Sequence, residues 1–87
     1  MTQEFVLYVK TTCPWCVSAK RWLKEKGYTW REIDVLRDSA AFAEMERISG
    51  QRFVPTLVVG EQVLSDFGIE ELEAFLQREG LSPGGVA

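Results

Sequence analysis

The stretch TTCPWC, residues 11–16, contains both cysteines of the chain, and its surroundings predict where they lie in the fold. The preceding EFVLYV (4–9) is short, apolar and rich in β-branched and aromatic residues, which predicts a buried strand. The following CPWCVSAKRWLKEKG (13–27) predicts a helix, because Pro14 suits its first position and Gly27 suits the residue after its end. The cysteines should therefore lie where a strand leads into a helix.

The alternation of strands and helices continues along the chain. YTWREIDV (28–35) predicts a second strand from its alternating apolar residues. DSAAFAEMERISG (38–50) predicts a second helix, with Asp38 or Ser39 as its N-cap and Gly50 as its stop. Each of these segments has an apolar side to bury against the rest of the domain.

The C-terminal half predicts a hairpin and a third helix. VPTLVVGEQVLSDF (54–67) predicts two strands joined at Gly60-Glu61, and IEELEAFLQREG (69–80) predicts an amphipathic helix. The order is therefore β-α-β-α-β-β-α, in which the first β-α-β unit implies two parallel strands and the hairpin adds two antiparallel ones. This order predicts the α/β class, with a four-stranded mixed sheet and helices on both faces.

Length and composition limit the classes of protein. The 87 residues suffice for one domain, which we place at residues 1–80, followed by a flexible tail at 81–87. The net charge of −3 and the pI of about 4.9 argue against a nucleic-acid binder. No apolar run approaches the roughly 18 residues of a membrane-spanning helix. The N-terminus lacks the pattern of a secretory signal, so we expect a cytoplasmic protein, acting as a monomer.

The inventory of reactive side chains narrows the chemistry of the cysteine pair. A structural zinc site usually has four Cys or His ligands, and this chain has two Cys and no His. The lack of His also removes the usual base of a Cys–His hydrolase. We therefore expect no metal site formed by this chain alone, and redox chemistry, a metal site shared with another molecule, and idle buried thiols remain.

The predicted strand–helix junction gives the two thiols different roles. Cys13 should lie at the helix N-terminus, where free backbone N–H groups and the helix dipole favour a thiolate, with Lys10 nearby. Cys16 lies one turn further on, on the apolar side of the helix, and should be more buried. Cys13 would then attack a substrate disulfide and Cys16 would resolve the mixed disulfide. Trp15, between them, should be partly exposed as a flat surface for a docking partner, or else contact the core.

Together these features resemble the glutaredoxin branch of the thioredoxin-like superfamily. The resemblance rests on VKTTCPWC (9–16), on SGQRFVP (49–55) and on the order of elements, and it covers about residues 3–80. It implies a thioredoxin-like fold and a cis Val54–Pro55 bond, with the Val54 backbone pairing with substrate. It also implies that Lys10 contacts the glycyl carboxylate of glutathione and that Trp15 replaces a tyrosine.

Two departures from the glutaredoxin pattern concern the recognition of glutathione. Many members have a Gly-Gly-x-Asp stretch after the fourth strand, whereas this chain has LSDFG (64–68), in which Asp66 lies two positions early. Where many members have Gln or Arg on the second helix, this chain has Phe42. Three residues could supply the missing polar side chain instead: Arg37, Gln51 and Arg52. The SDF segment also resembles the SGF of NrdH-redoxins.

The resemblance implies a thiol–disulfide oxidoreductase that reduces protein disulfides or glutathione mixed disulfides, with glutathione as its reductant. One alternative is an NrdH-redoxin-like electron donor to ribonucleotide reductase, reduced by thioredoxin reductase. Another is a non-enzymatic iron–sulfur cluster carrier, which the stiffening effect of Pro14 on the loop disfavours.

Overall fold

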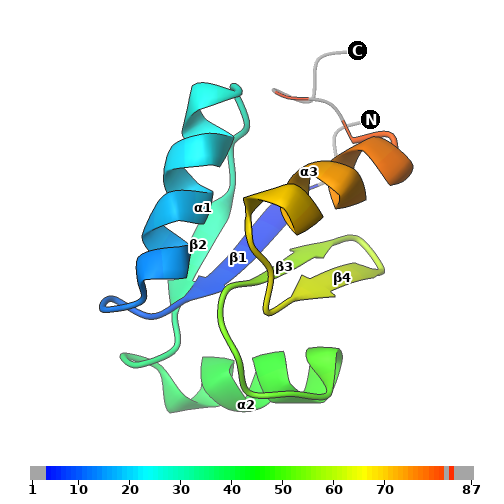
Figure 1. Ribbon diagram of the computed structural model, residues 1–87. Helices are drawn as coiled ribbons and strands as arrows, with labels where there is room; N and C mark the ends of the chain where they lie inside the picture. Colours follow the sequence, from blue (N-terminus) through cyan, green and yellow to red (C-terminus); the bar gives the residue numbers. More distant parts are fainter. Residues whose placement is uncertain (1–3, 82, 84–87) are drawn as a thin grey trace.

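The computed structural model describes residues 4–81 and 83, and it shows the predicted order of elements (Figure 1). The strands and helices, in chain order, are β1 (Phe5–Val9), α1 (Pro14–Glu25), β2 (Arg31–Asp34), α2 (Ser39–Ser49), β3 (Thr56–Val59), β4 (Gln62–Ser65) and α3 (Ile69–Arg78). The predicted starts and stops of the first two helices are confirmed. Cys13 is the N-cap of α1, Asp38 caps α2, and Gly27 and Gly50 adopt positive φ after these helices.

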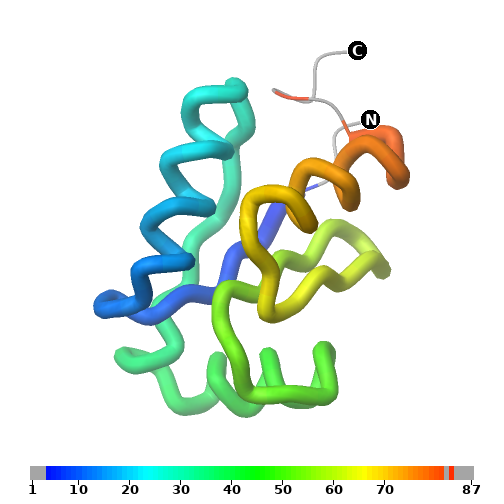
Figure 2. The backbone as a smooth tube through the Cα atoms, in the orientation of Figure 1, coloured from blue at the N-terminus to red at the C-terminus, as the bar shows by residue number. Residues whose placement is uncertain are grey.

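The four strands form one mixed sheet in the order β2-β1-β3-β4. β1 pairs in parallel with β2 and antiparallel with β3, and β3 pairs antiparallel with β4. The backbone trace shows α1 and α3 on one face of the sheet and α2 on the other (Figure 2). This arrangement confirms the predicted α/β class with helices on both faces.

The alternating side chains of β1 divide the interior into two cores. Phe5, Leu7 and Val9 point to the face that α1 and α3 cover, where they pack with Leu23 and Leu72. On the opposite face Tyr8 packs with Val35 and Met45, and Val6 contacts that group. Successive residues of a strand point to opposite faces, so one strand supplies both layers. Full burial of a Leu side chain stabilises the fold by about 1.5–3 kcal/mol.

The predicted second strand is too long at its start. β2 begins at Arg31, whereas Tyr28 and Trp30 lie in the connection before it. The reason is the way α1 ends: Gly27 has φ 88°, and the Tyr28 N–H donates to the Leu23 carbonyl at 2.9 Å. This bond closes the helix and takes the Tyr28 backbone away from the sheet.

The segment predicted as a flexible tail begins with an ordered contact. Leu81 packs against the α1 and α3 core, and its carbonyl accepts a hydrogen bond from the Tyr28 hydroxyl at 2.9 Å. Tyr28, which lies outside β2, thus contacts the first residue of the predicted tail. Residues 82 and 84–87 of the predicted tail lie outside the described residues.

Candidate active site: a dithiol at a helix N-terminus

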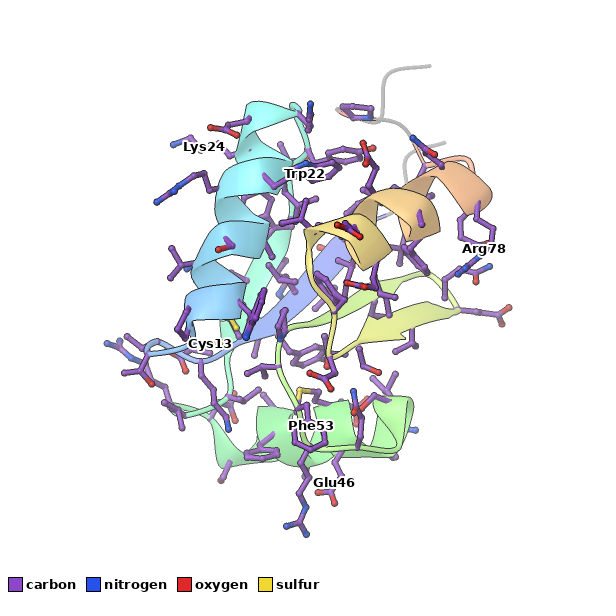
Figure 3. All side chains as sticks on the ribbon, in the orientation of Figure 1. Cys13, Trp22, Lys24, Glu46, Phe53 and Arg78 are labelled. Carbon is purple, nitrogen blue, oxygen red and sulfur yellow. The ribbon has the colours of Figure 1, made fainter. Side chains whose placement is uncertain are left out.

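Cys13 lies where β1 has ended and α1 begins (Figure 3). Its backbone is extended, and its Sγ accepts a hydrogen bond from the Cys16 N–H at 3.1 Å. The Cys13 N–H donates to the Lys10 carbonyl at 3.2 Å, which fixes the turn before the helix. Pro14 occupies the first helical position and leaves no N–H to satisfy there. A negative charge on Sγ would therefore gain from a backbone donor and from the helix dipole.

Cys16 lies one turn into α1, fully buried among the residues that face the sheet. Burial, which disfavours the charged form, raises the pKa of its thiol to about 12, and the nearby Cys13 side chain adds to the rise. Cys13 is half-buried, and both cysteines are free thiols. The predicted difference in burial is confirmed.

The loops before β3 and after β4 meet the dithiol loop at one end of the sheet. Tyr8 pairs with Thr56, so Val54 and Pro55 lie alongside the end of β1, where the chain turns toward Cys13. The Val54–Pro55 bond is cis, as the resemblance implied. Three separate segments thus converge at this end of the sheet.

The loop after β4 is hydrogen-bonded to the loop before β3 through Asp66. Its N–H donates to the Pro55 carbonyl at 2.9 Å, and its backbone has φ 54°, a left-handed conformation that costs energy for most residues with a side chain. The Asp66 side chain is exposed. A carboxylate therefore stands on the third loop of the site, on backbone held by hydrogen bonding.

Exposed aromatic side chains accompany the dithiol. Trp15 is 65% exposed, which confirms the prediction that it is at least partly exposed. Its ring also borders the loop after β4, because a Cβ on Gly68 would lie 3.9 Å from the Cζ3 of Trp15. Phe53 is 59% exposed and directly precedes Val54 (Figure 3). Trp15 therefore presents apolar area to solvent on the dithiol loop, and Phe53 does so on the segment before Pro55.

Lys10 makes a contact that sequence reasoning did not find. Its Nζ lies over the ring of Phe42, 5.6 Å from the ring centroid. Phe42 is half-buried on α2 and packs against the core of that face. The two residues are far apart in the sequence and no local pattern links them, so only the packing of α2 under the sheet reveals the pair.

Of the three candidates to replace the polar side chain that α2 lacks, two form ion pairs elsewhere and the third has a buried amide nitrogen. Arg37 pairs with Asp34 at 3.9 Å, and Arg52 pairs with Glu46 at 3.0 Å. Gln51 has a buried Nε2 for which the described residues supply no hydrogen-bond partner. None of the three is shown beside Lys10.

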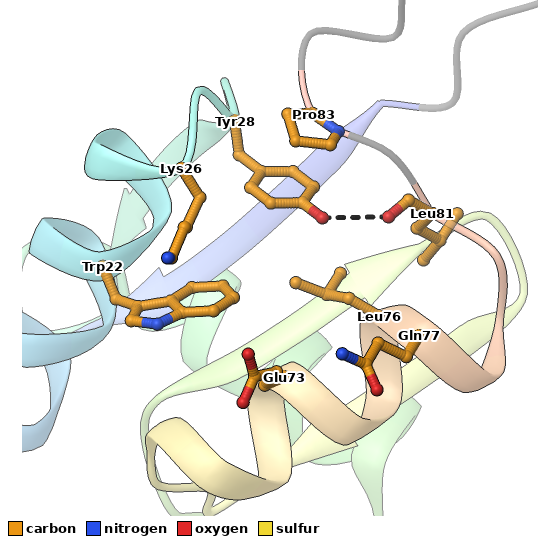
Figure 4. Close-up of a pocket in the computed structure, with 8 residues that line it drawn as sticks. All are labelled: Trp22, Lys26, Tyr28, Glu73, Leu76, Gln77, Leu81 and Pro83. Atoms are coloured by element: carbon orange, nitrogen blue, oxygen red, sulfur yellow. Dashed lines mark hydrogen bonds between the residues drawn. The ribbon is translucent and has the colours of Figure 1, made fainter.

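A pocket of about 230 Å³ lies away from the dithiol, between the end of α1, the middle and C-terminal half of α3, and the C-terminal segment (Figure 4). The rings of Trp22 and Tyr28 stack with centroids 6.2 Å apart, and the Lys26 Nζ lies 5.8 Å from the Trp22 ring centroid. Neither cysteine lines this pocket. It does not belong to the site built around Cys13.

Residues 4–81 and 83 include neither a membrane-spanning helix nor a cluster of metal ligands. No helix there is both long and apolar enough to pass through a membrane. Within the same residues, no three His, Cys, Asp or Glu side chains come together as a set of metal ligands.

A dithiol with one buried thiol, placed at a helix N-terminus on this sheet, defines a thiol–disulfide oxidoreductase of the thioredoxin fold. The family model described as Glutaredoxin matches residues 5–64, and the chain belongs to the glutaredoxin family. Glutaredoxin 3 of Escherichia coli K12 is 35% identical over 77 residues, which cover 88% of this chain and 90% of that protein.

Solved glutaredoxin structures share the fold. A glutaredoxin from Archaeoglobus fulgidus superposes with a TM-score of 0.76 at 24% identity, over 86% of this chain and 87% of that one. A buckwheat glutaredoxin, solved as a complex with glutathione, has a TM-score of 0.69 at 23% identity, over 90% of this chain and 71% of that one. At these identities the likeness is one of fold.

Proposed function

We propose that this protein is a dithiol glutaredoxin that reduces protein disulfides and glutathione mixed disulfides, with Cys13 as nucleophile and Cys16 as resolving thiol. The observation that carries the proposal is the hydrogen bond from the Cys16 N–H to the Cys13 Sγ, at the start of α1. The sulfur that can approach a substrate is therefore the one whose charge the backbone stabilises. The sulfur beneath it is buried and protonated until it is needed.

The reaction consists of two exchanges in which bonds and electrons balance. The Cys13 thiolate attacks one sulfur of the substrate disulfide, a new S–S bond forms, and the other substrate sulfur leaves as a thiolate that takes up a proton. Cys16 then loses its proton and attacks the Cys13 Sγ, which releases the second substrate sulfur as a thiol. The substrate has gained two electrons, and the protein holds a Cys13–Cys16 disulfide.

Glutathione is the proposed reductant and the proposed half of the mixed disulfide. Lys10 supports this proposal, since its ammonium can bind a carboxylate next to Cys13. The Val54 backbone, at the end of β1, can pair with the extended peptide, and the Asp66 carboxylate can bind an ammonium group. Two glutathione thiols would return the Cys13–Cys16 disulfide to the dithiol and leave as glutathione disulfide.

One observation favours a second candidate, an NrdH-redoxin-like donor to ribonucleotide reductase that thioredoxin reductase reduces. Asp66 has φ 54°, a backbone conformation that glycine adopts readily, which suits the Ser-Gly-Phe sequence of those proteins. We propose for either function a monomer in the reducing cytoplasm, where free thiols persist.

Replacement of each cysteine tests the roles, and a choice of reductase tests the electron source. Cys13→Ser should abolish reduction of a disulfide substrate, whereas Cys16→Ser should accumulate the mixed disulfide on Cys13, visible by mass spectrometry. Retained turnover in Cys13→Ser would reject the mechanism. With NADPH supplied, glutathione plus glutathione reductase should keep the wild type reduced. Reduction by thioredoxin reductase alone would favour the second candidate.

A further inference from the structure

The ammonium of Lys10 is held by an aromatic ring. The Nζ lies 5.6 Å from the centroid of Phe42, within the range in which the face of a ring attracts a cation. The ring itself is fixed, since Phe42 packs with the core formed by Tyr8, Val35 and Met45. A flexible Lys side chain therefore has a defined resting place against the ring of Phe42 on α2.

Contact with an aromatic ring does not neutralise the charge of Lys10, so its ammonium can still bind an anion. A carboxylate partner would neutralise the ammonium, whereas a ring attracts it without a compensating charge. Among the described residues, the ion pairs do not include Lys10. The acidic side chain at the end of β2, Asp34, accepts hydrogen bonds from Thr11 and from the Leu36 N–H, and it pairs with Arg37.

The position of Lys10 makes that charge relevant to the substrate. Its carbonyl accepts the hydrogen bond of the Cys13 N–H, so the residue is tied to the turn that carries the nucleophile. Ordering a Lys side chain on binding costs conformational entropy. A side chain already held by a ring loses less of it when a carboxylate arrives.

We propose that Phe42 is a positioning residue, whose ring holds the Lys10 ammonium beside Cys13 to receive a carboxylate of the disulfide substrate. The inference rests on the proposed function, which gives Lys10 this substrate contact. Phe42 acts through Lys10 and touches no reacting atom. An aromatic side chain thereby serves the carboxylate subsite at the position where many glutaredoxins carry a polar one.

Two variants and two substrates test the proposal. The substrates are a peptide–glutathione mixed disulfide and the same compound with its glycyl carboxylate converted to an amide, both reduced with dithiothreitol as electron source. Phe42→Leu keeps apolar volume but removes the ring, and it should raise KM for the carboxylate substrate about 2–5-fold, with kcat little changed. KM for the amide substrate should stay as in the wild type. Phe42→Tyr keeps a ring and should restore the wild-type KM for the carboxylate substrate.

Combination with Lys10→Gln separates the inference from the proposed function. Lys10→Gln should raise KM for the carboxylate substrate, and adding Phe42→Leu should change it no further. If Phe42→Leu alone leaves KM unchanged, or raises it equally for both substrates, the positioning role is wrong and the proposed role of Lys10 stands. If Lys10→Gln does not discriminate between the substrates, the positioning role and the substrate contact of Lys10 both fail. The Cys13→Ser test of the reaction is independent of these results.

Discussion

The buried thiol of Cys16 should make the stability of the fold depend on alkaline pH. Its pKa is about 12 in the folded protein, against an ordinary value of 9.0, chiefly because burial disfavours the thiolate. Below about pH 9 the thiol is protonated in both states and stability does not depend on it. Above that pH the unfolded chain releases the proton while the folded chain keeps it, so stability is lost as pH rises toward 12.

The size of this loss of stability follows from the difference between the pKa of Cys16 in the folded protein and in the unfolded chain. Each pH unit between the two values costs about 1.4 kcal/mol of unfolding free energy. At about pH 10.5 the loss should therefore reach up to about 2 kcal/mol relative to neutral pH. Burial is the largest single cause of the raised pKa and does not depend on Cys13, so a loss of stability at alkaline pH should remain when Cys13 is replaced.

The assay is urea unfolding at about pH 7 and about pH 10.5, with Cys13→Ser and the double variant Cys13→Ser/Cys16→Ala compared at each pH. The Ser at position 13 prevents disulfide formation, and the Ala at position 16 removes the titrating thiol. Tyr8 and Tyr28, whose burial raises their pKa values, are present in both proteins, so their titration cancels.

The expected result is a stability difference between the two proteins that shifts by up to about 2 kcal/mol in favour of the double variant at the higher pH. An equal difference at both pH values would refute the reasoning. It would mean that the Cys16 thiol is as well solvated in the folded chain as in the unfolded one.

Three further substitutions should change stability in urea unfolding. Leu23→Ala should cost about 2–5 kcal/mol because Leu23 is fully buried in the α1 and α3 core, and a cost under about 1 kcal/mol would contradict that packing. Asp38→Ala should cost about 1 kcal/mol through loss of the bond that the Ala41 N–H donates to the cap of α2, whereas Asp38→Asn should retain most of it. Asp66→Gly should stabilise the fold by about 0.5–1 kcal/mol because φ is 54° there, and a loss of stability would indicate that the carboxylate stabilises the loop.

Local patterns in the sequence were sufficient to predict the order of strands and helices and the difference in burial between Cys13 and Cys16. Pro14 and Gly27 mark the ends of a helix through their backbone chemistry alone, and Asp38 and Gly50 do the same for the next one. The burial of Cys16 followed from its position on the apolar stripe of α1. Each of these signals comes from residues that lie within a few positions of one another in the sequence.

Contacts between distant segments could not be read from such patterns. Tyr28 has the apolar, aromatic character of a strand residue, yet the closing bond of α1 and its hydroxyl bond to Leu81 place it outside β2. A β-propensity is a weak preference that such tertiary bonds override.

The sequence by itself determined the chemistry: two thiols at the start of a helix, one able to meet a substrate and one beneath it. It also determined the order of the strands and helices around them. What only the tertiary structure decided is the surroundings of that chemistry. The ring of Phe42 meets Lys10, and the Asp66 N–H meets the Pro55 carbonyl, because α2 packs under the sheet and β4 pairs beside β3. Such contacts depend on how entire helices and strands pack, so no stretch of neighbouring residues encodes them.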